Sequence, residues 1–163
     1  MKQAYSPEWH DVFLSHTRAD REQAEQLAEQ LRAAGLSVYL DVDDEALSRL
    51  HGRELAERLK NILSRSRLLL FVFSARSTES RWMPWELGLA HGVVGRVLLW
   101  PLNAAAGRAA ARQEYLKLYE QVNATHPLED VLARVYSARD AAVAPAHEHA
   151  AAALGEITGQ QGL

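Results

Sequence analysis

The sequence contains no cysteine, which excludes several kinds of chemistry at once. Disulfide scaffolds, zinc fingers, iron–sulfur clusters and cysteine nucleophiles all need that residue. Neither sign of charge dominates, with 18 basic against 21 acidic residues and a formal net charge of −3. We therefore expect no nucleic acid and no membrane surface among its partners. No apolar run reaches the roughly 20 residues of a membrane span, and residues 1–11 have no apolar signal core, so we expect a cytoplasmic protein.

The 163 residues are 48% hydrophobic, which is the composition of one globular domain. Helical spacing is clear in three places. The first stripe, of Ala24, Leu27, Ala28 and Leu31, ends before Gly35, and the third ends at Gly95. Between them, the second stripe is formed by Leu55, Leu59, Ile62 and Leu63. The first stripe begins after Thr17 and Asp20, whose spacing resembles a capping box. Four short apolar runs alternate with the helical patterns and read as strands: Asp11–Ser15, Leu36–Asp41, Arg67–Ser74 and Val97–Leu102.

The order of strand, helix, strand, helix, strand, helix and strand predicts an α/β fold, a doubly wound parallel sheet with helices on both faces. The last third of the chain is less regular. Residues 104–119 are rich in alanine and read as one helix, and residues 141–157 read as a terminal helix. Val131–Ser137 fits either a fifth strand or part of a helix.

Several common motifs are absent. No G-x-G-x-x-G follows the first strand, no P-loop is present, and no G-x-S-x-G elbow occurs. The acidic run from Asp41 to Glu45 invites a calcium interpretation, but an EF-hand loop starting at Asp41 would need Gly and Glu where Ala46 and Gly52 stand. We therefore expect a solvated acidic loop, and no metal site.

One short segment contains candidate ligand-binding residues: Arg81-Trp82-Met83-Pro84-Trp85-Glu86-Leu87. Pro84 belongs in the first turn of a helix, so the helix becomes regular here. Trp82 and Glu86 are four residues apart, which places them about 40° from each other on one helical face. An indole beside a carboxylate suits a planar, cationic ligand. The alternative is that Trp82 is a core residue and Glu86 only favours the positive end of the helix.

Taken in order, four segments resemble a bacterial TIR (Toll/interleukin-1 receptor) domain. They are Asp11–His16 with Thr17-Arg18-Ala19-Asp20, then Gly35–Asp41, then Ser64–Ser74, and finally Ser80-Arg81-Trp82 with Glu86 in a W-x-x-x-E pattern. The resemblance covers residues 9–102 in register and is loose beyond. It implies a flavodoxin-like five-stranded parallel sheet, with a TIR domain over residues 9–140 and a C-terminal helix and tail over residues 141–163.

The resemblance also implies an activity. Catalytic members of the family cleave the bond between nicotinamide and ribose in NAD+, and they carry a glutamate at the position of Glu86. NAD+ would be the substrate, and no cofactor is implied. The product, whether linear, cyclic or conjugated ADP-ribose, is left open. The residues that match the substrate-binding positions of the family, or that border them, are Trp82, Phe13, His16, Thr17, Arg18, Asp41 and Ser74.

For several of these residues a plainer interpretation exists. Phe13 lies within a strand and fits a core position, Thr17 fits a helix cap, and Arg18 fits an exposed surface. Ser74 could be only a turn residue.

Two kinds of partner follow from the resemblance: other TIR domains, through self-association, and a separate effector protein that responds to the product. This is the arrangement of Thoeris-type antiphage defence. Two other functions stay open. One is a non-catalytic adaptor, or a mimic that binds host TIR proteins. The other is an enzyme like the nucleoside deoxyribosyltransferases, which also use a glutamate in an α/β sheet.

Overall fold

Five parallel strands form the central sheet of the computed structural model, which describes residues 9–40, 49–77 and 83–141. Every neighbouring pair is parallel, with β1 between β2 and β3. This order, in which the chain reverses direction across the sheet between β1 and β3, is that of flavodoxin-like folds and confirms the predicted fold class. In spatial order the strands are β2 (Val38–Leu40), β1 (His10–His16), β3 (Ser66–Phe73), β4 (Val97–Pro101) and β5 (Glu120–Gln121).

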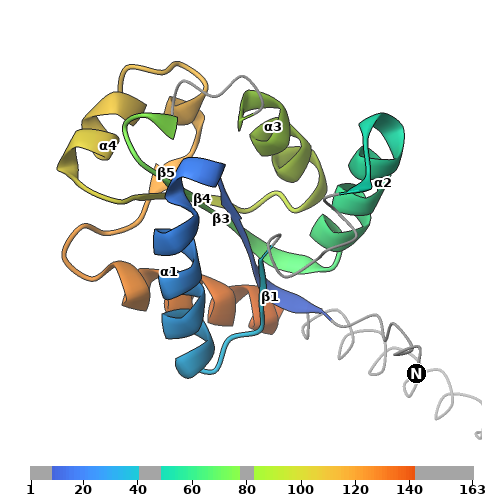
Figure 1. The fold of residues 1–163 in the computed structure, drawn as a ribbon. Coiled ribbons are helices and arrows are strands. Elements are labelled where there is room, and N and C mark those ends of the chain that lie inside the picture. The colour runs from blue at the N-terminus through green and yellow to red at the C-terminus, as the bar shows by residue number, and fades with distance from the viewer. Residues whose placement is uncertain (1–8, 41–48, 78–82, 142–163) are drawn as a thin grey trace, which may run out of the picture.

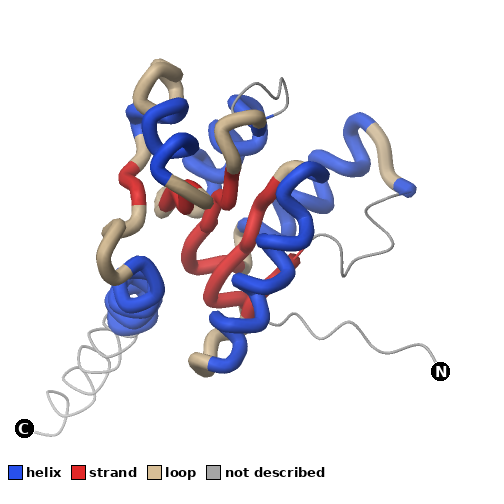
Figure 2. Tube along the Cα trace, turned by 60° about the vertical axis from the view of Figure 1, so that its left-hand side comes forward, coloured by secondary structure: helices blue, strands red, loops and turns tan. Residues whose placement is uncertain are grey.

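Helices cover both faces of the sheet (Figures 1 and 2). One face is covered by α1 (Arg21–Ala33) and by a helix over residues 127–141. The other is covered by α2 (Gly52–Leu63), α3 (Met83–Val93) and α4 (Ala104–Ala110). Neighbouring strand residues therefore enter different cores: Val12 and Leu14 face α1, whereas Phe13 faces the α2 and α3 side.

The α1 helix follows its sequence pattern closely. Its four buried residues are the predicted stripe, Ala24, Leu27, Ala28 and Leu31. The helix ends at Ala33, and Gly35 then adopts a φ of +88°, a left-handed conformation that glycine enters at little cost. The short helix η1 (Arg18–Asp20) precedes α1. The predicted capping box does not form, because the Thr17 hydroxyl donates to the Asp20 carboxylate and accepts no backbone N–H.

The C-terminal third differs from its prediction. The alanine-rich helix stops at Ala110 and is followed by a short helix η5 (Leu116–Leu118), because burial of Leu116 turns the chain toward the core. The fifth strand is β5, which the sequence did not indicate. Val131–Ser137 belongs to the helix over residues 127–141, so the helical alternative was correct. The terminal helix predicted beyond residue 141 lies outside the described residues, and the division at residue 140 stays a prediction.

An ion-pair cluster ties the 127–141 helix to the amino end of β1. Asp11 is 5% exposed and accepts hydrogen bonds from Arg139 Nε at 2.9 Å, Arg139 Nη2 at 2.6 Å and the Ser37 amide at 2.8 Å. Arg67 lies 3.4 Å from the same carboxylate. Burial raises the pKa of Asp11, but the Arg139 and Ser37 hydrogen bonds outweigh it and hold that pKa below its ordinary 3.8.

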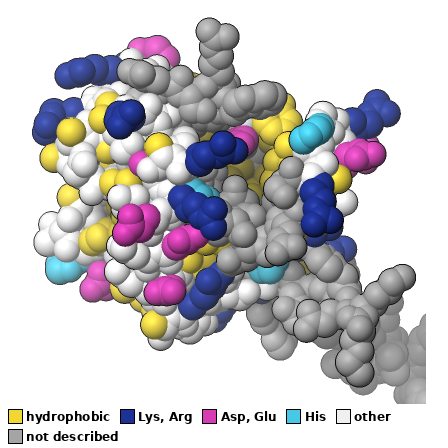
Figure 3. All heavy atoms as spheres, in the orientation of Figure 1, with side chains coloured by type: hydrophobic (Ala, Val, Ile, Leu, Met, Phe, Trp, Pro, Cys, Tyr) yellow, Lys and Arg dark blue, Asp and Glu magenta, His cyan; other side chains and the backbone are white. Residues whose placement is uncertain are grey.

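The surface carries charges of both signs, interspersed on the face shown in Figure 3. Among the described residues on that face, the Lys and Arg side chains are separated by acidic and uncharged ones. Across the ranges 9–40, 49–77 and 83–141, no helix is both long and apolar enough to cross a membrane.

Candidate functional site

The carboxyl ends of β1 and β3 lie side by side where the strand order reverses. His16 closes β1 and is in register with Val72, and Ser74 follows β3 directly. In doubly wound sheets this position forms the crevice in which ligands bind. The loop after β1 carries Thr17 and Arg18, so the structure brings four of the predicted site residues to one edge of the sheet.

A buried carboxylate joins the two loops at this edge. Asp20 is 4% exposed, and its Oδ2 accepts the Thr17 hydroxyl at 3.1 Å and the Ser74 amide at 3.1 Å. The turn after β3 is closed further by Ser77, whose hydroxyl and amide donate to the Ser74 carbonyl at 2.8 and 3.2 Å. Segments 54 positions apart in the sequence are thus held by one side chain.

The charge of this carboxylate is stabilised in place. Burial raises the pKa of Asp20, but hydrogen bonds from the Ser74 backbone and from nearby serine and threonine hydroxyls outweigh it. The net result is a pKa below the ordinary 3.8, so Asp20 is ionised at neutral pH.

Glu86 lies in the first turn of α3 and is half-buried. Pro84 is the second residue of the helix, as predicted from its tolerance for that turn. Leu87 and Ala90 are 1% and 0% exposed and hold the helix against the sheet. Because α3 runs from the carboxyl end of β3 toward the amino end of β4, its first turn lies at the carboxyl edge of the sheet (Figure 1).

Tyr119, the residue before β5, makes two contacts with α3. The Tyr119 hydroxyl donates to the Leu87 carbonyl at 3.4 Å, and the rings of Tyr119 and His91 meet edge to face with centroids 5.6 Å apart. Tyr119 is half-buried, and burial raises its pKa above 10.0, so it stays protonated and able to donate. The residue that precedes β5 therefore helps to fix the helix that carries Glu86.

Beyond this edge and Glu86, the structure describes one more of the predicted site residues, Phe13. Phe13 is 5% exposed with its ring 5.0 Å from that of Tyr39, so it is a core residue, and its assignment to substrate binding is not supported. Its position in the middle of a covered strand explains this. Arg18 is exposed at the sheet edge, and Thr17 is half-buried against Asp20. Trp82 and Asp41 lie outside the described residues.

Comparison with known proteins is decisive for the family. The model of the TIR domain family matches residues 12–132. The chain belongs to the TIR domain family. Two solved structures of a metazoan TIR-STING receptor from C. gigas share the fold of this TIR domain, at TM-scores of 0.58 and 0.60 and 16% identity. Each alignment covers 81% of this chain, and 42% and 41% of those chains.

Two curated relatives of this TIR domain have names that describe activities. One is the probable 3′ cyclic ADP-D-ribose synthase ThsB′ of Bacillus cereus (strain MSX-D12), 35% identical over 116 residues, or 69% of this chain. The other is the NAD(+) hydrolase TcpA of Theionarchaea archaeon (strain DG-70-1), 33% identical over 96 residues, or 57% of this chain. The aligned regions span 60% and 28% of the length of these relatives.

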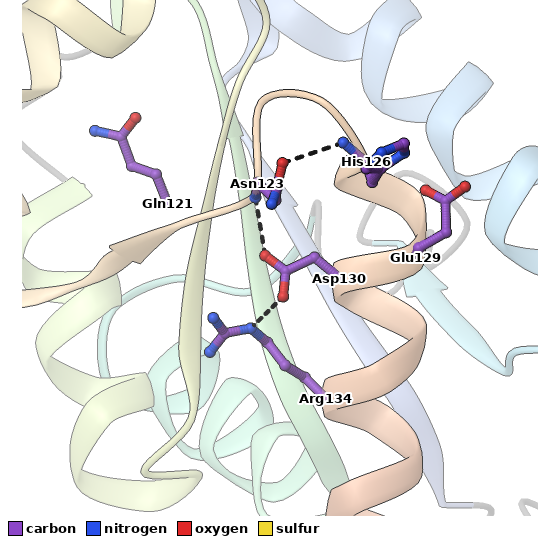
Figure 4. Close-up of a pocket in the computed structure, with 6 residues that line it drawn as sticks. All are labelled: Gln121, Asn123, His126, Glu129, Asp130 and Arg134. Carbon is purple, nitrogen blue, oxygen red and sulfur yellow. Dashed lines mark hydrogen bonds and ion pairs between the residues drawn. The ribbon is translucent and has the colours of Figure 1, made fainter.

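This TIR domain also has an open hollow of about 560 Å³ at the carboxyl end of β5 (Figure 4). Its polar groups are largely paired within the chain: Asp130 accepts the Asn123 amide at 2.9 Å and Arg134 Nε at 2.9 Å, and Arg134 also pairs with Glu120 at 2.6 Å. The helix that borders it packs on the opposite face of the sheet from α3. None of the predicted site residues lines it; its walls are Gln121, Asn123, His126, Glu129, Asp130 and Arg134.

Sequence reasoning missed two residues at the site of this TIR domain. Asp20 was interpreted as part of a helix cap and of the first segment that resembles the family, without a role at the site, and Tyr119 only as the end of a helix. A buried acid is the one signal that could have indicated Asp20, but burial is not visible in a sequence. Within the described ranges, no group of three or more His, Asp or Glu side chains is gathered in a way that could hold a metal ion.

Proposed function

We propose that this TIR domain is an NAD+ nucleosidase that breaks the nicotinamide–ribose bond, with Glu86 as its catalytic residue. The observation that carries the proposal is the place of Glu86, half-buried in the first turn of α3 at the carboxyl edge of the sheet. The names of the two relatives, a cyclic ADP-ribose synthase and an NAD(+) hydrolase, support the same reaction.

The chemistry suits a single carboxylate. When the bond between ribose C1′ and the nicotinamide nitrogen breaks, its electron pair goes to nicotinamide, which leaves as a neutral molecule. Positive charge then develops on the ribose, as in glycoside hydrolysis. The Glu86 carboxylate stabilises that charge and accepts hydrogen bonds from the ribose hydroxyls. Because nicotinamide leaves as a neutral molecule, no strong general acid is needed. A water or hydroxyl nucleophile then bonds to C1′ and gives up its proton to solvent.

The other residues at this edge suit the rest of the substrate. Arg18 is exposed beside the β1 terminus and can donate charge-assisted hydrogen bonds to the pyrophosphate. His16 and Ser74 border the same crevice from neighbouring strands. Trp82 is proposed to line the nicotinamide pocket through its indole face, on the W-x-x-x-E pattern alone. Asp41 is proposed to border the ribose because it ends the segment Gly35–Asp41, which resembles the second strand of the family.

The first test is nicotinamide release from NAD+, followed by chromatography at high protein concentration. Glu86→Gln removes the charge and keeps the shape, so we expect the rate to fall at least about a hundredfold. The matched control is Glu54→Gln, an exposed glutamate in the first turn of α2, which should release nicotinamide at the wild-type rate. Equal rates in wild type and Glu86→Gln would contradict the proposed role.

The mass of the second product separates the possible reactions. Attack by water gives ADP-ribose, attack by a group of the same molecule gives a cyclic form, and attack by another nucleophile gives a conjugate. A wild-type protein that releases no nicotinamide, and that binds another TIR domain equally well with Glu86→Ala, would instead be an adaptor.

The proposed cellular role is antiphage defence of the Thoeris type. In this role the domain assembles through TIR–TIR contacts, and its product is read by a separate effector protein. Two results are expected: specific activity that rises with protein concentration, and phage protection that is lost with Glu86→Gln but kept with Glu54→Gln. Protection that survives Glu86→Gln at equal protein levels would contradict this role.

A further inference from the structure

We infer that Asp20 is a positioning residue for the proposed NAD+ reaction: its carboxylate holds the loops after β1 and β3 in the geometry that Glu86 requires. The inference rests on the proposed function. Asp20 is 4% exposed, so it does not itself touch substrate. Its effect passes through the atoms that it binds, the Thr17 hydroxyl and the Ser74 amide.

Asp20 links the end of η1 to the turn after β3. Asp20 ends η1 and precedes α1, so it is fixed by the packing of α1 on the sheet. From there its Oδ2 reaches across the point of strand reversal to the first residue after β3. A backbone amide at the end of a strand lacks its partner in the ladder, and the carboxylate supplies one. Asp20 is therefore held in place by α1, and its carboxylate in turn holds the turn after β3.

The turn after β3 lies close to Glu86 in the sequence. Ser77 closes the turn by donating twice to the Ser74 carbonyl, and Glu86 follows nine positions later. Directly after Glu86, α3 is held by burial of Leu87 and by the Tyr119 hydroxyl, which donates to the Leu87 carbonyl. The turn after β3 and the helix that carries Glu86 are thus each held by contacts of their own, on either side of residues 78–82, and Asp20 holds the turn.

The rate of the proposed reaction depends on the position of the Glu86 carboxylate. A displacement of about 1 Å in a catalytic group can cost on the order of a hundredfold in rate. Loss of the Asp20 carboxylate leaves the half-buried Ser74 amide and the Thr17 hydroxyl without this acceptor, so the turn must move toward water or another partner. We expect Asp20→Ala to lower kcat/KM by roughly tenfold to a hundredfold, mainly through kcat.

The experiment compares Asp20→Ala and Asp20→Asn with a matched control, Asp130→Asn. Asp130 also accepts a backbone amide and a side-chain donor, with a pKa below 3.8, but it lies on the opposite face of the sheet from α3. Rates are divided by the folded fraction measured at the assay temperature. Asparagine keeps one acceptor oxygen, so Asp20→Asn should fall between wild type and Asp20→Ala. Hydrogen exchange at the Ser74 amide is measured on the same proteins.

The expected result is faster exchange at Ser74 and lower kcat in both Asp20 variants, with neither change in Asp130→Asn. If the Asp20 variants do not fold, Thr17→Val and Ser77→Ala each remove a single hydroxyl from the same network, and a fall in kcat of about twofold to tenfold is expected.

Wild-type kcat/KM per folded molecule in the Asp20 variants would overturn the inference and leave the proposed function intact. A wild-type protein that releases no nicotinamide would overturn both, because there would be no reaction to position. Exchange at Ser74 would still report in that case whether Asp20 holds the turn.

Discussion

Replacing Asp11 by asparagine removes the charge that joins the 127–141 helix to the sheet. The Asp11 side chain is 7% exposed. It accepts hydrogen bonds from Arg139 Nε, from Arg139 Nη2 and from the Ser37 amide. Asparagine presents one NH2 group in place of an oxygen, and every arrangement turns that group toward at least one of these donors. At least one hydrogen bond is therefore lost, and the others lose their ionic character.

The size of the effect follows from the contacts. A hydrogen bond to a charged group contributes about 1.5–3 kcal/mol. Arg139 is 38% exposed, so its share is screened by water and lies at the low end. We expect Asp11→Asn to lower the free energy of unfolding by about 3 kcal/mol, which corresponds to a fall in Tm of about 6–12 °C for a domain of this size.

The assay is urea unfolding followed by circular dichroism, with Arg139→Gln, Arg67→Gln and the Asp11→Asn/Arg139→Gln double variant. Arg139→Gln should cost about 1–2 kcal/mol, and Arg67→Gln less, because its nitrogen lies 3.4 Å from the carboxylate. In the Asp11→Asn background, the Arg139 change should cost clearly less than in the wild type, because the ionic part of the contact is already lost. A loss below about 1 kcal/mol for Asp11→Asn, or additive losses in the double variant, would refute the reasoning.

Three further predictions follow from single contacts. Leu70→Ala, at a residue that is 0% exposed in the central strand, should lower the free energy of unfolding by about 2–5 kcal/mol in the same urea assay. Tyr119→Phe removes only the hydroxyl that binds the Leu87 carbonyl, so it should cost about 1 kcal/mol and leave the circular dichroism spectrum unchanged. The folded-state pKa values of Asp11 and Asp20 lie below 3.8, so both contribute stability above their unfolded pKa and lose it as pH falls through the folded one. Thermal melts should therefore change little between pH 7 and 5 and fall steeply below about pH 4; a fall centred near pH 6 would point to other groups.

The first hundred residues were predictable because their signals are local. A strand covered on both faces is apolar at every position, and β3 fits that rule almost throughout. The α1 stripe and Gly35 likewise depend only on near neighbours in the chain. Once these elements were placed, their alternation determined a parallel sheet, and short right-handed connections left few arrangements open.

The last third was harder for two different reasons. β5 is two exposed polar residues, Glu120 and Gln121, which carry no apolar pattern and become a strand only because β4 offers its free edge. The 127–141 helix did have a signal that was not used: Pro127 stands at its first position, as is common in helices. Apolar residues then follow at helical spacing, at Leu128, Val131, Leu132 and Val135, and all of them contact the core.

The residues of the candidate site also fall into two groups. Some belong to a sequence motif, and others come together only when the chain folds. The spacing of Trp82 and Glu86 indicated a chemical pair, and Pro84 correctly indicated the helix that holds Glu86. The link from Asp20 to Ser74 spans 54 positions and joins an acid to a backbone amide. The donor is the backbone N–H of Ser74, which nearly every residue type has, so the identity of residue 74 could not have predicted this hydrogen bond. A motif therefore includes Asp20 but does not show what its carboxylate binds, a main-chain amide that folding brings to it where the strand order reverses.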